Sequence, residues 1–228
     1  MRIEANTAPK DGMYKGIGTD STDYPVLYDA AQAIKGVEGF TCELGVYYGG
    51  SSALIVQACI DNDDPRIHVG IDPYGNIEFA DPRGAPDDKV RGYPNSIKHS
   101  ALPDLFKFFS IKQVEFLFFN MEAAEFFQRF ADGIPVYNQC KTIINSYALV
   151  HFDTPASMDG STKIAEAEFF QSRTPVGGIW VFDDVGTGTK GEGGWYHHEN
   201  VHARMCDWGF ELLTKAWKWS YRKVRQPA

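Results

Sequence analysis

Carboxylate side chains occur at or near the ends of four of the five strands that the sequence predicts before its C-terminal strand pair. These residues are Glu43, Asp72, Asp153 and the pair Asp183 and Asp184. The carboxyl ends of parallel strands meet at one edge of a sheet, and ligands bind outside that edge. Carboxylates gathered there repel one another unless another group neutralises them. The pattern therefore predicts an edge that binds hydroxyl groups, cations or both.

A glycine-rich turn follows the first of these strands, 40–44. Gly45, Gly49 and Gly50 permit a tight turn and a close approach of the backbone to a ligand. Ser51 or Ser52 can cap the helix that follows, whose body at 53–60 is almost wholly apolar. Because the first N–H groups of a helix have no partner within it, this turn suits a nucleoside-type cofactor. The alternative is an ordinary turn that binds nothing.

The next two strands, 66–72 and 114–119, add candidates at the same edge. Asp72 can accept hydrogen bonds from both hydroxyls of a ribose. It could also simply begin a turn, since Asp is common there. Asn120 and Met121 follow the third strand and are expected to contact a base, although strand-end and helix-cap roles explain them equally well.

The last two acidic strand ends suggest a metal. Asp153, Asp183 and Asp184 offer only oxygen ligands, which suit a hard divalent cation such as Mg²⁺. Strand-end capping and turn formation are the alternative for the pair.

Strands and helices must alternate to place these residues together. The pattern predicts an α/β fold: a single doubly wound, mainly parallel, seven-stranded Rossmann-like sheet with helices on both faces and an antiparallel C-terminal strand. The terminal pair is predicted at 210–215 and 217–224. Residues 1–228 form one predicted domain, with an N-terminal arm at 1–22. Five prolines make 73–104 a predicted lid or substrate insertion.

Composition excludes several classes. The chain of 228 residues is 43% hydrophobic and has a net charge of −8, which argues against a sequence-independent nucleic-acid binder. The basic residues near the C-terminus are explained by a solvated tail or edge strand: Lys215, Lys218, Arg222, Lys223 and Arg225. The four cysteines are expected to be free thiols. No signal-peptide core and no membrane span is found, so a cytoplasmic location is expected.

The motifs resemble a known family. Glu43-Leu-Gly-Val-Tyr-Tyr-Gly49-Gly-Ser51 looks like the first motif of class I S-adenosylmethionine-dependent methyltransferases, and Val69-Gly-Ile-Asp72 resembles the second. The later motifs, around Asp153 and Asp183-Asp184, are similar to metal-dependent O-methyltransferases. The macrocin O-methyltransferase family is the nearest pattern, and catechol O-methyltransferase is more distant. Neither a G-x-G-x-x-G nor a phosphate-binding or nucleophile-elbow motif is present.

The resemblance implies Mg²⁺-assisted methyl transfer from S-adenosylmethionine to a hydroxylated small molecule, such as a sugar or natural product. No nucleic acid or membrane is expected as a partner, and a homo-oligomer is possible. The implied metal ligands are Asp153, Asp183 and Asp184. The predicted cofactor-binding residues are Glu43, Gly45, Tyr47, Gly49, Ser51, Asp72, Asn120, Met121 and Asp153.

The chain departs from the family pattern after Asp153. Thr154-Pro155-Ala156 follows, so Ala156 stands where the family has its base. His197 or His198 could substitute, and these two with Asp153 are the predicted catalytic residues. The missing base keeps two alternatives open. One is a non-catalytic cofactor- or sugar-binding protein on the same fold, and the other is a related metal-dependent hydroxylase.

Overall fold

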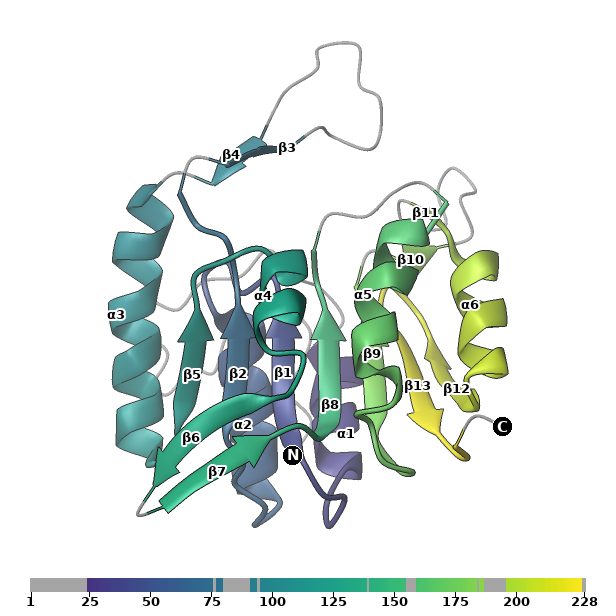
Figure 1. The fold of residues 1–228 in the computed structure, drawn as a ribbon, viewed down its shortest axis with the longest axis horizontal. Coiled ribbons are helices and arrows are strands. Elements are labelled where there is room, and N and C mark those ends of the chain that lie inside the picture. The colour runs from purple at the N-terminus through teal and green to yellow at the C-terminus, as the bar shows by residue number, and fades with distance from the viewer. Residues whose placement is uncertain are drawn as a thin grey trace.

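A seven-stranded sheet forms the centre of the protein, seen in a computed structural model (Figure 1). The structure describes residues 24–75, 77–79, 91–93, 95–138, 140–154, 159–183, 185–186 and 196–226. Strand order is β12-β13-β9-β8-β1-β2-β5. The bounds are β1 Phe40–Leu44, β2 His68–Ile71, β5 Phe116–Phe119, β8 Tyr147–Phe152, β9 Ile179–Phe182, β12 Phe210–Lys215 and β13 Trp219–Lys223.

The sheet is parallel except at β13, which runs antiparallel to both β9 and β12. The predicted fold class is therefore confirmed, including the antiparallel C-terminal strand. The central strands β1, β2, β8 and β9 are buried along almost their whole length. Their continuous apolar runs reflect coverage by helices on both faces.

Three helices cover each face of the sheet (Figure 1). Helices α4, α5 and α6 lie on the near face in that view, whereas α1 and α2 lie on the far face. Their bounds are α1 Tyr24–Ala33, α2 Gly50–Asp61, α3 Asn95–Lys112, α4 Ala123–Arg129, α5 Ser161–Gln171 and α6 His198–Asp207. α3 joins the α2 side, since its Leu105, Phe108 and Phe109 pack with Val56 of α2.

The two faces of the sheet differ in polarity. Cys42, Val69 and Phe152 belong to the apolar cluster on the α4–α6 side. The residues that alternate with them on the α1–α3 side include Thr41, Glu43, His68 and His151, which are completely buried. Period-two alternation thus collects the strands' buried polar side chains on one face.

Two segments differ from the prediction. Between 130 and 146, where the sequence predicts no strand, the structure has a hairpin of β6 (Ile134–Asn138) and β7 (Cys140–Ile144). Ile134, Val136 and Ile144 bury against the α4–α6 side, which stabilises the hairpin. In 73–104, a hairpin of β3 (Ile77–Phe79) and β4 (Arg91–Tyr93) precedes α3, which begins at Asn95. The predicted arm at 1–22 lies outside the described residues.

The basic C-terminal residues are solvated only in part. Lys218 and Lys223 are completely buried, whereas Lys215 is exposed. The reason is the place of β13, which lies between β9 and β12 instead of at an edge. All four cysteines are free, as predicted. Among the described helices, none combines the length and apolar character that crossing a bilayer needs.

Candidate functional site

Asp72 organises the turn after β1. Strands β1 and β2 are parallel neighbours, so the turn that follows β1 lies beside the residue that follows β2. Asp72 Oδ2 accepts hydrogen bonds from the backbone N–H groups of Val46 and Tyr47, each at 2.9 Å. Tyr47 adopts a left-handed conformation with φ 50°, which is uncommon for a residue with a side chain. The carboxylate therefore holds the turn in a conformation that it would not favour alone.

The other oxygen of Asp72 is unpaired within the described part of the chain. Oδ1 is buried and makes no hydrogen bond to any described residue. Burial raises the pKa of Asp72 to about 6, while the N–H groups of Tyr47, Val46 and Tyr74 oppose that rise. A buried carboxylate oxygen without a donor is costly, and a ligand hydroxyl would satisfy it. This oxygen fits the predicted contact with a ribose.

Asn120 and Tyr74 fix the turn around Asp72. The Asn120 side-chain amide, at the end of β5, donates to the carbonyls of Asp72 at 3.1 Å and Tyr74 at 3.2 Å. The Asn120 side-chain oxygen accepts a hydrogen bond from Lys98. The Tyr74 hydroxyl in turn donates to the Tyr47 carbonyl. Asn120 thus lies at the predicted edge of the sheet, where its side-chain amide binds backbone carbonyls of the protein.

The glycine turn is tight, as predicted, and close packing against neighbouring segments requires its glycines. Gly45 has φ 87°, and a Cβ there would lie 2.1 Å from the Asp153 carbonyl oxygen. Gly49, with φ 83°, precedes α2 and would place a Cβ against Leu105. The turn therefore packs tightly between the end of β8 and α3.

The helix cap differs from the prediction. Gly49 is the N-cap of α2, and neither Ser51 nor Ser52 caps it with its side chain. The first bond within the helix runs from Ala53 N to Gly49 O at 2.9 Å. The N–H groups of residues 50–52 thus precede the first helical bond, the arrangement that binds anionic or polar ligands at helix starts.

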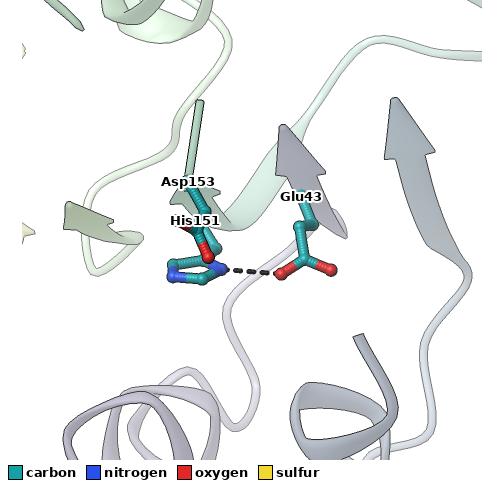
Figure 2. Close-up of side chains that lie close together, drawn as sticks. All are labelled: Glu43, His151 and Asp153. Atoms are coloured by element: carbon teal, nitrogen blue, oxygen red, sulfur yellow. Dashed lines mark hydrogen bonds and ion pairs between the residues drawn. The ribbon is translucent and has the colours of Figure 1, made fainter. Parts of the chain in front are cut away.

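Glu43 belongs to a buried chain of hydrogen bonds below the edge (Figure 2). Ser52 donates to one carboxyl oxygen, and His151 Nδ1 lies 2.8 Å from the other. The chain continues from Ser52 Oγ to His68 Nε2 at 3.0 Å, and from His68 Nδ1 to Thr41 Oγ1 at 2.9 Å. Because the Ser52 hydroxyl donates to Glu43, its oxygen accepts the His68 Nε2 proton. The Thr41 hydroxyl then donates to His68 Nδ1.

The Glu43–His151 contact is a neutral pair. Burial raises the pKa of Glu43 to about 8, opposed by the Ser52 hydrogen bond. Burial lowers the pKa of His151 well below its usual value, and the positive charge of Lys218 adds to that effect. Burial also lowers the pKa of His68 to about 3. At neutral pH one proton is therefore shared between Glu43 and His151, without an ion pair.

Asp153 stands beside this pair. One side-chain atom from each of Glu43, His151 and Asp153 lies within 4.8 Å of the others. In Figure 2 the second ring nitrogen of His151 faces away from Glu43, and that nitrogen is buried without a partner among the described residues. Asp153 therefore lies close to the hydrogen-bonded pair of Glu43 and His151.

Two buried lysines lie near the ends of β8 and β9. The Lys163 ammonium, from α5, donates to the carbonyls of Phe152 at 3.1 Å and Thr154 at 2.6 Å. The Lys218 ammonium forms an ion pair with Asp183. Both lysine side chains are completely buried. Lys218 thus pairs with the strand-end acid Asp183, whereas Lys163 binds the backbone carbonyls on either side of Asp153.

This arrangement does not fit the predicted magnesium site. Asp183, one of three proposed ligands, is bound by an ammonium, and the described residues that gather around Asp153 are Glu43 and His151 instead of Asp183. Asp184 and Ala156 lie outside the described residues.

The remaining predicted residues are placed as follows. Ser51 is buried in the first turn of α2, and Met121 packs against the apolar cluster of the α4–α6 side. His197 and His198 lie where β11 (Tyr196–His197) meets α6, and β11 pairs with β10 (Val185–Gly186). Their roles stay predictions. The sequence reasoning missed the buried contacts of Ser52, His68, His151 and Lys218, although His68 and Thr41 alternate with apolar residues as buried partners would.

No family model and no curated protein matches this sequence. Solved structures do match in fold. CalS11, a calicheamicin methyltransferase, has a TM-score of 0.57 at 17% identity, covering 87% of this chain and 76% of its own. The O-methyltransferase NovP has a TM-score of 0.52 at 16% identity, covering 89% and 79%. TomG from Streptomyces achromogenes, an O-methyltransferase solved with S-adenosylmethionine, has a TM-score of 0.56 at 12% identity, covering 96% and 92%.

Identities this low support the fold alone, and the sheet order and the glycine turn agree with it. The more specific likeness to the macrocin family stays a prediction. The chain has the fold of the class I S-adenosylmethionine-dependent methyltransferases.

Proposed function

We propose that this protein transfers a methyl group from S-adenosylmethionine to a hydroxyl oxygen of a small molecule. The observation that carries the proposal is the buried Oδ1 of Asp72, which has no hydrogen-bond partner among the described residues and lies beside the turn that Asp72 holds. It supports a ligand with hydroxyl groups at the place where this fold binds a nucleoside. The cofactor would supply an electrophilic methyl group on a sulfonium.

The chain's own residues divide the remaining work. Asp72 would accept the ribose hydroxyls, and the start of α2 would offer its free N–H groups. In the transfer, the methyl–sulfur bond breaks as a methyl–oxygen bond forms, and the hydroxyl proton must leave. Asp153, which follows β8 and lies beside the Glu43–His151 pair, is our candidate for the carboxylate that takes that proton. Alignment of the oxygen with the methyl group would supply much of the rate.

The acceptor class comes from the neighbours in fold. CalS11 is a TDP-rhamnose 3'-O-methyltransferase of calicheamicin biosynthesis, and TomG acts in tomaymycin synthesis. These names support a hydroxylated natural product or its sugar as the acceptor. The net charge of −8 supports a small acceptor over a nucleic acid.

Calorimetric titration with S-adenosylmethionine and S-adenosylhomocysteine tests the cofactor. We expect saturable binding of both by the wild-type protein. Absence of binding of either would refute the proposal.

The second test separates an enzyme from a protein that only binds the cofactor. Incubation with methyl-labelled S-adenosylmethionine and a panel of nucleotide sugars should transfer label to an acceptor. Asp153→Asn should abolish transfer, and the variant should still bind the cofactor, with an affinity that the same calorimetric titration measures. Cofactor binding without transfer to any hydroxylated acceptor would favour the non-catalytic alternative.

A further inference from the structure

We infer that the ammonium of Lys218 takes the place of a divalent cation at Asp183, so that this edge of the sheet is neutralised by the chain itself. Its consequence for catalysis rests on the proposed function. Its test measures cation binding, so it can fail or succeed separately from methyl transfer.

Strand register places the two residues face to face. β13 pairs antiparallel with β9, and Trp219 lies opposite Phe182. The next position of this ladder sets Lys218 opposite Asp183. The side chain of Lys218 is completely buried and that of Asp183 is 7% exposed, so water screens the contact little. The ion pair is thus a product of the sheet topology and not of a mobile surface side chain.

A divalent cation at Asp183 would have to lie beside this ammonium. A buried like charge disfavours the binding of a cation, and here the carboxylate that would attract it is already hydrogen-bonded. The charged neighbours reinforce the point. Lys163 adds a second buried ammonium at the end of β8, where it binds the Phe152 and Thr154 carbonyls. Among the described acids nearby, Glu43 interacts electrostatically with both Lys218 and Asp183, and Glu166 interacts with Lys163.

For the proposed reaction, the consequence is a fixed positive charge in the protein in place of an exchangeable metal. An acceptor oxygen near Asp183 would meet an ammonium that cannot be removed by a chelator. We expect cofactor binding and any methyl transfer to be unchanged by EDTA.

Manganese binding tests the inference directly. The electron paramagnetic resonance signal of free Mn²⁺ falls when the ion binds a protein. Wild-type protein should leave that signal unchanged. In Lys218→Met, which keeps the side-chain volume and removes the charge, Mn²⁺ affinity should rise about tenfold or more. Mn²⁺ should also raise the melting temperature of that variant and not of the wild type.

Two controls make the result specific. Lys223→Met removes another buried ammonium of β13, one that binds the carbonyls of Gln171 and Thr174 and no carboxylate. It should lower stability without gaining Mn²⁺ affinity. The double variant Lys218→Met, Asp183→Asn should lose the Mn²⁺ binding that the single variant gained.

Tight Mn²⁺ or Mg²⁺ binding by the wild-type protein would overturn the inference, as would a Lys218→Met variant that gains no affinity. If that variant does not fold, the wild-type titration with Mn²⁺ and the EDTA experiment still decide. Calorimetry with S-adenosylhomocysteine on the same wild-type sample shows whether the proposed function fails separately.

Discussion

Both halves of the sheet edge carry acids, but the acids have opposite kinds of partner. Over β1 and β2, Glu43 and Asp72 are bound by neutral donors: a serine hydroxyl, an imidazole and backbone N–H groups. Over β8 and β9, the Lys218 ammonium pairs with Asp183, and the Lys163 ammonium binds the backbone carbonyls on either side of Asp153. An acid held by neutral donors can keep an oxygen for a ligand, as Asp72 does. An acid paired with an ammonium has its charge neutralised within the chain.

The difference shows that the type of residue at a strand end does not fix its role. Asp72 and Asp183 both directly follow buried parallel strands. What separates them is the strand alongside. β2 has β5 as its outer neighbour, which ends in the amide of Asn120, whereas β9 has β13, which begins after Lys218.

The largest effect is expected on the ammonium side. Lys218→Met should lower the free energy of unfolding by about 3–5 kcal/mol, because it leaves the Asp183 carboxylate buried without its cation. Urea denaturation at pH 7 measures this. Adding Asp183→Asn should restore part of the loss. A single-variant cost below about 1 kcal/mol would mean that the pair is as weak as a surface salt bridge, and the two halves would then differ less than we infer.

On the neutral-donor side, Asp72→Ala should weaken S-adenosylhomocysteine binding by about 2–4 kcal/mol, since it removes the proposed ribose acceptor and the two bonds to the turn. Calorimetry measures the affinity, and circular dichroism checks the fold. Asp64→Asn is the matched control, because Asp64 binds Arg66 away from this edge. Equal affinity in Asp72→Ala and wild type would contradict the assignment.

The protonation of Glu43 predicts a pH dependence. Its pKa is about 8 in the folded protein, against 4.5 when unfolded, so the folded state retains a proton that the unfolded state has released. The free energy of unfolding should therefore fall as pH rises toward 8. His68 and His151, with lowered pKa values, act in the opposite sense but only below about pH 6.5.

Between pH 6.5 and 8 the fall should amount to about 2 kcal/mol, and Glu43→Gln should abolish it. Gln keeps a donor toward His151 and an acceptor for Ser52. Urea titrations of both proteins across this range measure the slope. A wild-type protein whose stability is constant over the range would show that Glu43 is ionised, as an acid beside an ammonium would be.

The smallest effect concerns Asn120. Asn120→Ala removes two hydrogen bonds to the turn of Asp72 and Tyr74, so S-adenosylhomocysteine binding should weaken by about 1 kcal/mol. Glu125→Ala, which breaks an exposed ion pair with Arg129 on α4, should leave affinity unchanged. Identical affinities in the two variants would show that Asn120 does not support cofactor binding at the ends of β1 and β2.

Local patterns predicted the fold class and the placement of the glycine turn beside Asp72. Alternating strands and helices predicted a mainly parallel sheet, because a helix between two strands lets them run parallel. The glycines at 45 and 49 and the acid at 72 are neighbours in short βα turns, so their positions followed from the sequence.

The ion pair over β9 depends on a pairing between segments that are far apart in the sequence. Lys218 and Asp183 meet only because the last strand inserts between β9 and β12. A terminal strand at an edge would leave the same lysine in solvent, and nothing in the local sequence distinguishes the two. Likewise, the chain of hydrogen bonds from Thr41 to His151 forms only when β1 has the observed registers with both β2 and β8.

The contact between Gly45 and the Asp153 carbonyl has a mechanical consequence. With no space for even one methyl group between them, the turn that would cradle the nucleoside and the strand end that would receive the acceptor form one stiff unit. A ligand that shifts either one must shift the other. Loading of the first substrate should therefore set the geometry met by the second, and exchanging acceptor specificity by changes near Asp153 would retune cofactor affinity as well.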